Sequence, residues 1–332
     1  MPANAGNEPR GLVFVYTSGM IISARRFPFA SWIVIVMVAL MTAACGGGGS
    51  DGGERGAPPP SGEKPAASMS RENVDAMSRE HADDEAVPSG AAGAAAGGVV
   101  SEELPYADVD GSLVRGYFAA PGDMVEPLPA VIMIHEWWGL NDNIRAMADR
   151  LAAAGYMVLA VDLYGGRTAA TPSDARTLMM ELLENQEQAE ENLRQAHAFL
   201  QEVGAPGVAS IGWCLGGHWS LRTALLFPER LDAAVIYYGQ VILDEEELAP
   251  LQVPLLGLFA EEDTGIRLES VQAFRSAMDE LEKDLTLKIY PDVGHAFANP
   301  TGNNFDRDAA EDAWALTLEF LADHLPSASS GG

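Results

Sequence analysis

Hydrophobic and polar positions divide the chain into three regions. One apolar run spans residues 30–44, and residues 46–102 are dominated by Gly, Ala, Ser, Pro and acidic side chains. From about residue 103 to 325, short apolar runs alternate with segments whose apolar residues recur at helical spacing. This alternation predicts one folded domain over 103–325, large enough to bury a stable core, with a flexible tail at 326–332.

The short apolar runs are rich in Val, Ile and Leu and show little polar alternation, as is typical of strands buried on both faces of a parallel sheet. They lie at 130–134, 157–161, 208–211, 233–237, 255–259 and 285–289. Helices are predicted between them at 143–154, 173–202, 215–227, 268–281 and 306–324. The order predicts an α/β fold with a mostly parallel, doubly wound sheet, to which 114–119 adds an antiparallel edge.

The first apolar run has the parts of a secretory signal. Arg25 and Arg26 precede it, and it ends on small residues directly before Cys45. This ending resembles a bacterial lipobox, in which the cysteine is acylated, although Thr42 stands where a leucine is usual. An ordinary signal peptide or an uncleaved anchor is the alternative. Residues 1–45 are therefore predicted to be a leader that places the protein in a bacterial cell envelope, bound to the lipid bilayer through Cys45 and facing the periplasm or the exterior.

Two features around the leader refine this prediction. Met20 places the arginines nearer the N-terminus than Met1 does, and it is the better candidate start. Residues 46–102 have a composition that cannot build a core and are predicted to be a flexible tether.

Charge narrows the range of partners. The chain has 48 acidic and 20 basic residues, a net charge of −28, and most of the excess lies in the predicted domain. Such a field repels nucleic acid, which is therefore not an expected partner. Nothing in the sequence indicates an oligomer, and a monomer is the default expectation.

The segment with the most specific chemistry is Gly212-Trp-Cys214-Leu-Gly216-Gly217, between a predicted buried strand and a predicted helix. This is the pattern of a nucleophile elbow with cysteine in place of serine. The nucleophile of an elbow has a strained backbone, so its near neighbours must be almost free of side chains. The Leu215 N–H would then face an oxyanion. The alternative is an inert buried thiol.

A cysteine nucleophile needs a base and an acid. His295 lies in a loop after the last predicted strand, where this fold places its base, and Asp263 follows the strand before it. Asp263 would fix the tautomer of His295, although Glu261 and Glu262 lie beside it. The other histidines are His81, His135, His197, His218 and His324. The alternatives are that His295 is an ordinary surface histidine and that Asp263 belongs to a solvated acidic loop.

Over residues 103–325 the chain resembles the dienelactone hydrolase family. The resemblance rests on Ile134-His-Glu136-Trp137-Trp138-Gly-Leu, Ala160-Val-Asp-Leu-Tyr-Gly-Gly166, the elbow, Glu261-Glu-Asp263 and Gly294-His-Ala-Phe-Ala-Asn299-Pro. It implies an α/β-hydrolase fold and a Cys214–Asp263–His295 triad. It also implies that Glu136 contacts the thiol and controls its ionisation, and that Trp137 supplies the second oxyanion N–H.

One position departs from the family pattern. The founding enzymes have a substrate-binding arginine four residues after the catalytic histidine, and here that residue is Asn299. Arg176 is a candidate for another anchor of a substrate carboxylate. Dienelactone is therefore not the expected substrate. The aromatic residues Trp137, Trp138, Trp213 and Phe297 predict an apolar pocket, unless they simply pack the core.

Together these features predict a hydrolase of small esters or lactones that works through a thioester on Cys214. No metal or organic cofactor is expected, because no Cys/His cluster or phosphate-binding glycine loop is visible in the sequence. The alternative is an α/β-hydrolase-fold protein of the cell envelope that binds a ligand without turnover. A thiol redox protein is disfavoured, since Cys45 belongs to the leader and Cys214 has no resolving partner.

Overall fold

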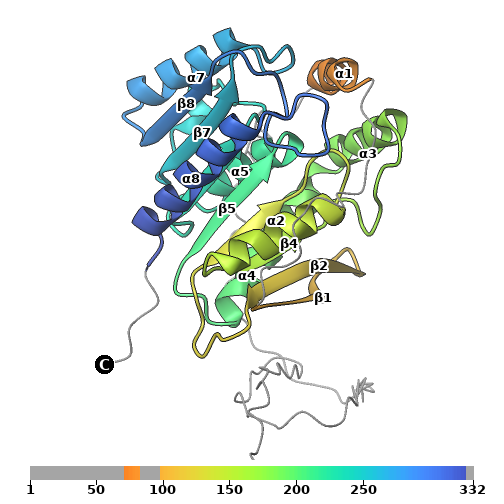
Figure 1. Cartoon of the computed structure of the whole chain (residues 1–332), viewed down its shortest axis with the longest axis vertical. Coiled ribbons are helices and arrows are strands. Elements are labelled where there is room, and N and C mark those ends of the chain that lie inside the picture. The colour runs from red at the N-terminus through yellow and green to blue at the C-terminus, as the bar shows by residue number, and fades with distance from the viewer. Residues whose placement is uncertain (1–70, 83–97, 327–332) are drawn as a thin grey trace, which may run out of the picture. The chain divides into compact units, whose positions relative to one another are not determined.

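A single eight-stranded sheet forms the centre of the domain. The computed structural model describes residues 71–82 and 98–326. The strands lie in the order β1-β2-β4-β3-β5-β6-β7-β8, with β1 and β2 antiparallel and β3 to β8 parallel (Figure 1). They span Val99–Val109, Ser112–Pro121, Ala130–Ile134, Met157–Val161, Val208–Trp213, Ala233–Tyr237, Leu255–Ala260 and Leu285–Tyr290. The predicted mostly parallel α/β sheet is confirmed, and its edge is a hairpin of two strands.

The strands from β3 to β7 are buried along their whole length, as expected for apolar runs without alternation. Helices therefore cover both faces. In Figure 1, α2 and α8 lie in front of the sheet, and α4 and α5 lie behind it. The Arg150 guanidinium of α2 lies 4.3 Å from the ring centre of Trp314 in α8. The helices span Asp142–Ala153 (α2), Pro172–Glu184 (α3), Gln186–Glu202 (α4), Leu215–Leu226 (α5), Glu245–Leu248 (α6), Leu268–Glu280 (α7) and Arg307–His324 (α8).

The predicted helix over 173–202 is two helices. α3 ends and α4 begins around Asn185, whose φ of −127° and ψ of 41° are not helical. Both helices bury an apolar stripe, so the hydrophobic period continues across the break and the sequence pattern does not reveal it.

A further helix, α1 (Arg71–Glu80), lies within residues 46–102, the range predicted to be a tether. It packs against α3 (Figure 1). Arg71 pairs with Glu184 at 3.0 Å, and Asp75 pairs with Arg176 at 2.6 Å. Val74 and Met77, one turn apart, are buried. Part of the predicted tether is thus a helix attached to the domain, and none of the helices in the described ranges has the length and apolarity needed to cross a membrane.

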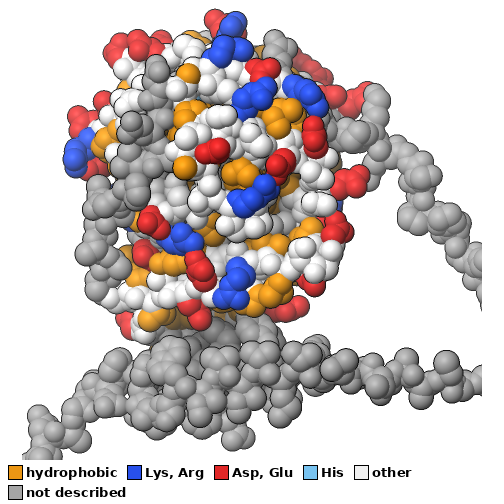
Figure 2. All heavy atoms as spheres, turned by 90° about the vertical axis from the view of Figure 1, so that its right-hand side faces the viewer, with side chains coloured by type: hydrophobic (Ala, Val, Ile, Leu, Met, Phe, Trp, Pro, Cys, Tyr) orange, Lys and Arg blue, Asp and Glu red, His pale blue; other side chains and the backbone are white. Residues whose placement is uncertain are grey.

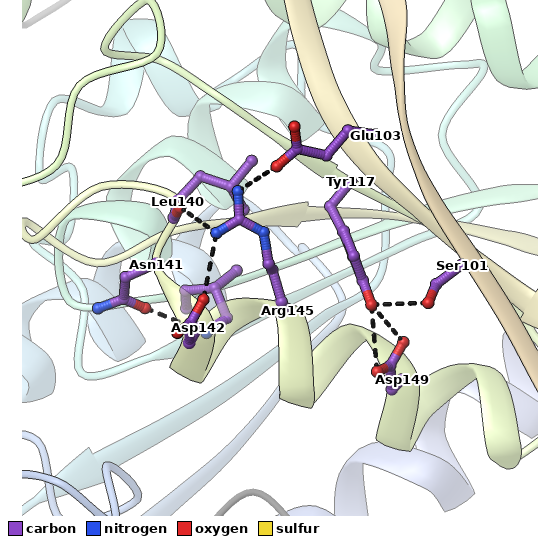
Figure 3. Close-up of polar contacts among 9 residues, drawn as sticks. Ser101, Glu103, Tyr117, Leu140, Asn141, Asp142, Arg145 and Asp149 are labelled. Atoms are coloured by element: carbon purple, nitrogen blue, oxygen red, sulfur yellow. Dashed lines mark hydrogen bonds and ion pairs between the residues drawn. The ribbon is translucent and has the colours of Figure 1, made fainter. Parts of the chain in front are cut away.

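The start of α2 is tied to the β1–β2 hairpin by a polar cluster (Figure 3). The Arg145 guanidinium pairs with Glu103 of β1 and donates to the Leu140 carbonyl at 3.3 Å. The Tyr117 hydroxyl of β2 donates to the carboxylate of Asp149 at 3.0 Å. Since α2 follows the loop after β3, these contacts also hold that loop, which carries Glu136 and Trp137.

Acidic and basic side chains are interspersed on the face of the domain shown in Figure 2, with small hydrophobic areas between them. The large exposed apolar residues include Leu113, Val125 and Leu243, which come from separate segments. Scattered residues of this kind are normal for a folded surface.

Helix α5 approaches the sheet closely because it begins with glycines. A Cβ on Gly216 would collide with the Ile134 carbonyl oxygen and lie 2.7 Å from that of His135, both at the end of β3. A Cβ on Gly217 would lie 2.6 Å from the Tyr237 carbonyl oxygen of β6. These are backbone atoms that cannot rotate away, so the start of α5 lies directly on the ends of two strands.

Gly216→Ala is therefore expected to lower the free energy of unfolding by about 1–3 kcal/mol or more, because the added methyl group forces α5 away from β3. Urea denaturation followed by circular dichroism measures the change. Gly302→Ala is the matched control, since its Cβ would meet no atom closer than 3.6 Å. Equal stabilities of the two variants would contradict this account of the packing.

Candidate active site

Cys214 occupies the turn between β5 and α5. Its φ of 56° and ψ of −115° lie in a region that side-chain-bearing residues rarely adopt. The turn is tight enough that a Cβ on Gly212 would overlap the Gly216 backbone. The Cys214 N–H donates to the Tyr237 carbonyl at 3.0 Å, which holds the strained residue on β6. The backbone is that of a nucleophile elbow, and the thiol is buried.

Two backbone segments meet beside this thiol. Leu215 is the first residue of α5, and N–H groups in the first turn of a helix have no acceptor within it. The close contact of Gly216 with Ile134 and His135 brings the end of β3 to the same place, and Glu136 and Trp137 follow directly. The N–H groups of Leu215 and Trp137 therefore come from the two segments that the sequence predicted to form an oxyanion hole.

His295 and Asp263 form a buried pair after β8 and β7. The His295 Nδ1 lies 2.7 Å from Asp263 Oδ2. The other oxygen of Asp263 accepts the N–H groups of Gly265 at 2.9 Å and Ile266 at 2.7 Å. These bonds fix the carboxylate and make Nδ1 the protonated nitrogen, which leaves Nε2 for the thiol. That Nε2 is buried without a hydrogen-bond partner among the described residues.

The electrostatics of the thiol and the imidazole favour an ion pair. Burial alone would raise the pKa of Cys214, but the His295 and His81 rings lower it to about 6. Burial alone would lower the pKa of His295, but Asp263 and Cys214 raise it well above its ordinary value. A thiolate beside an imidazolium is the nucleophilic state of a cysteine–histidine pair.

Helix α1 and the residue that follows it also contact this site. The Met77 Sδ lies 3.4 Å from the Cys214 Sγ. The His81 ring, just after the helix, lies 4.8 Å from the Trp137 ring and 4.9 Å from the His295 ring between centres. Sequence reasoning missed both residues. The available signal was the spacing of Val74, Met77 and His81, which places them on one helical face within an otherwise polar segment.

Asn299, which stands where the founding enzymes of the family have an arginine, holds Glu136 in place. Asn299 donates from Nδ2 to Glu136 Oε2 at 2.7 Å. Its own oxygen accepts the N–H and the hydroxyl of Thr301 at 2.9 and 2.8 Å, so the orientation of the amide is fixed. Asn299 thus positions Glu136, while a contact between Glu136 and the thiol stays a prediction.

The residues predicted to line a pocket are found in different places. Trp138 packs its ring against Trp137, at 4.9 Å between centres. Trp213 packs against Tyr237 of the neighbouring strand, and Phe297 packs against Tyr238 and Tyr290, so both serve the core. Arg176 pairs with Asp75 of α1 on a half-exposed surface. Arg176 therefore anchors α1, and the substrate-binding role expected of it has no support in this geometry.

Two of the other histidines are structural. The His135 Nδ1 lies 2.6 Å from the Glu136 carbonyl oxygen, and its Nε2 accepts the Leu163 N–H at 3.1 Å. The His218 Nδ1 lies 2.9 Å from the Gln240 carbonyl oxygen, and burial lowers its pKa to about 4. Burial lowers the pKa of His135 as well. Both rings are neutral and support the loops around the elbow.

One group of possible metal ligands occurs among the described residues at this site. One ring nitrogen each of His81 and His295 and the Cys214 Sγ lie within 4.8 Å of one another, and all three residues are buried. The sequence shows no such cluster because its members are far apart along the chain. The leader, with Cys45, and the tail at 327–332 lie outside the described residues, so their assignments stay predictions.

Comparison with known proteins identifies the family of the chain. A protein of Saccharolobus solfataricus named as a carboxymethylenebutenolidase is 32% identical over 259 residues, covering 67% of this chain and 98% of its own. Protein usf of Aquifex pyrophilus is 34% identical over 226 residues, covering 65% and 96%. A crystal structure from Klebsiella pneumoniae, named as a dienelactone hydrolase, has a TM-score of 0.62 at 26% identity, covering 68% of this chain and 98% of its own. The Dienelactone hydrolase family profile matches residues 114–325, and the chain belongs to this family.

Proposed function

We propose that the protein hydrolyses small carboxylic esters or lactones through a covalent thioester on Cys214. The observation that carries the proposal is the placement of Cys214 at a strained elbow, with His295 and its partner Asp263 beside it. The dienelactone hydrolase family, and relatives named as carboxymethylenebutenolidases, support the same reaction class.

The first half of the reaction forms the thioester. The Cys214 thiolate attacks the carbonyl carbon, and the negative charge that develops on the oxygen is stabilised by the N–H groups of Leu215 and Trp137. The carbon–oxygen single bond then breaks. The leaving alkoxide takes the proton of His295 Nε2, while Asp263 stabilises the imidazolium up to that step.

The second half releases the acid. Water attacks the thioester carbon and gives a proton to the now neutral His295, and the same N–H groups hold the second oxyanion. The carbon–sulfur bond breaks, the acid leaves, and the thiolate is restored beside the imidazolium. The balance is one ester and one water consumed for one acid and one alcohol, or one hydroxy acid from a lactone.

The surroundings of the thiol favour an uncharged, apolar acyl group. The rings of Trp137 and Trp138 pack together and are buried, and the Trp137 ring lies 4.8 Å from the His81 ring between centres. Asn299, in the position of the family's arginine, is engaged with Glu136. An apolar site with few polar groups is the usual setting for small-molecule binding.

Substrate must displace Met77 before it can react. A sulfur 3.4 Å from Sγ lies at the distance that a carbonyl carbon needs for attack. Access to the nucleophile is therefore linked to a shift of the Met77 side chain or of α1.

Cys214→Ala is expected to reduce kcat/KM for p-nitrophenyl acetate by about a thousandfold or more, because no other group forms the acyl-enzyme. Cys214→Ser is expected to fold normally with little activity. The matched control is Cys45→Ser, which removes the chain's other cysteine. Full activity of Cys214→Ala would refute the mechanism. Tight ligand binding without any acyl adduct in intact mass spectra would favour the non-catalytic alternative.

Alkylation of Cys214 by iodoacetamide is expected to accelerate with rising pH around a midpoint near 6, because the pKa of the thiol is lowered to about 6 and only the thiolate reacts. The rate is low below this pH and level above it. In His295→Gln the loss of the positive partner moves the midpoint up toward about 8.5, the ordinary range for a thiol. The measurement uses a Cys45→Ser chain in EDTA, and a wild-type midpoint above 8 contradicts the ion pair.

Met77→Ala is expected to raise both the alkylation rate and kcat/KM. Burying a methionine side chain stabilises by about 1.5–3 kcal/mol, so its loss shifts α1 toward the open state by roughly tenfold or more. Met147→Ala, in α2, is the control for the loss of a methionine elsewhere. A lower or unchanged rate in Met77→Ala would show that Met77 does not restrict access.

A further inference from the structure

Four electron-pair donors converge at the Cys214 sulfur. They are the thiol itself, the Met77 thioether at 3.4 Å, and one ring nitrogen each of His81 and His295 within 4.8 Å. Two come from the α1 segment, one from the elbow and one from the loop after β8. In the hydrolytic mechanism the thiol and His295 carry the bond-making and proton-transfer steps, and neither Met77 nor His81 takes part in them.

The spacing of these donors suits a bound metal ion. Ligands bonded at about 2.0–2.3 Å in a tetrahedral array lie roughly 3.3–3.8 Å apart. The sulfur–sulfur distance of 3.4 Å falls in this range, and the Cys214 sulfur and the two ring nitrogens lie within 4.8 Å of one another, so a bound ion would draw them closer together. The His295 Nε2 is buried without a hydrogen-bond partner among the described residues, and Asp263 holds its Nδ1 in the way that carboxylates support metal-binding histidines.

The types of donor select the kind of ion. A thiolate and a thioether are soft ligands, and imidazole accepts both copper and zinc. Zn²⁺ binds thiolate and imidazole but has little use for a thioether, whereas Cu(I) binds all four. Once the thiol has lost its proton, lone pairs of the Met77 and Cys214 sulfurs face each other. A metal ion between the two sulfurs would accept both lone pairs.

We propose that Met77, His81, Cys214 and His295 form a binding site for a soft metal ion, Cu(I) in particular, that is assembled when α1 packs over Cys214. Binding forms metal–sulfur and metal–nitrogen bonds, releases to solvent the one proton that the Cys214–His295 pair holds on His295 Nε2, and involves no change of oxidation state. The bound ion occupies the nucleophile and the base together, so the site is a reversible metal-dependent block on the chemistry of Cys214.

The binding experiment does not depend on the proposed hydrolysis. The full chain, with Cys45→Ser to remove the competing thiol, is titrated anaerobically with Cu(I) against a chromogenic chelator, and in parallel with Zn²⁺. One Cu(I) per chain is expected. His81→Ala should weaken Cu(I) binding by more than about 100-fold, which is the upper end of the loss for a group outside the ligand shell. Met77→Ala should weaken Cu(I) binding but leave Zn²⁺ binding almost unchanged.

Matched controls are His324→Ala and Met147→Ala, whose side chains belong to α8 and α2; both should bind Cu(I) like the parent chain. Circular dichroism confirms that each variant is folded. Equal Cu(I) affinity in the parent and His81→Ala chains, or in the parent and Cys214→Ser chains, would overturn the site.

Inhibition is measured separately. Cu(I) should suppress p-nitrophenyl acetate hydrolysis by the parent chain, a chelator should restore it, and His81→Ala should resist inhibition. Cu(I) binding at the four residues without any esterase activity would uphold the metal site and count against the proposed hydrolysis. Activity that is unaffected by one equivalent of bound Cu(I) would overturn the proposed block.

Discussion

The whole site depends on the backbone of Cys214. A left-handed residue between a buried strand and a helix reverses the chain within a few residues, and this is possible only because Gly212 and Gly216 can approach each other without side chains. Gly216 and Gly217 in turn allow α5 to rest on the ends of β3 and β6. One strained residue therefore fixes the position of the thiol at the end of β5, directs the start of a helix toward it and brings the loop after β3 alongside.

Much of this arrangement was predictable because local sequence determines it. The elbow is a contiguous pattern with a steric cause, and the buried strands are apolar runs of the expected length. His295 and Asp263 were chosen by chain order and loop position, and the 2.7 Å contact between them agrees with that choice. The sequence alone does not exclude Glu261 or Glu262 as the acid that pairs with His295. Asp263 differs from them in its burial and in the hydrogen bonds that it accepts from the loop, which residue type does not reveal.

The parts of the site that the sequence does not predict depend on contacts between residues that are far apart in the chain. α1 is a short polar helix in a Gly-, Ala- and Pro-rich region, and it is stabilised by what it covers and not by its own propensity. Arg176 was expected to bind substrate, yet its partner, Asp75, lies on that helix. Asn299 could be identified as a missing arginine, but its hydrogen bond to Glu136 is visible only in three dimensions.

The contact between His81 and His295 joins nearly the first and the last described parts of the chain. Contacts of such high sequence separation are slow to form, because most of the chain must be in place before they are gained. During synthesis, the elbow of β5 and α5 can fold before the loop that carries His295 has emerged. The segments that cover the thiol, α1 and the helix α3 on which it packs, precede the elbow in the chain. The thiol can therefore be covered while it still lacks its base, and it becomes reactive only when the loop after β8 joins it.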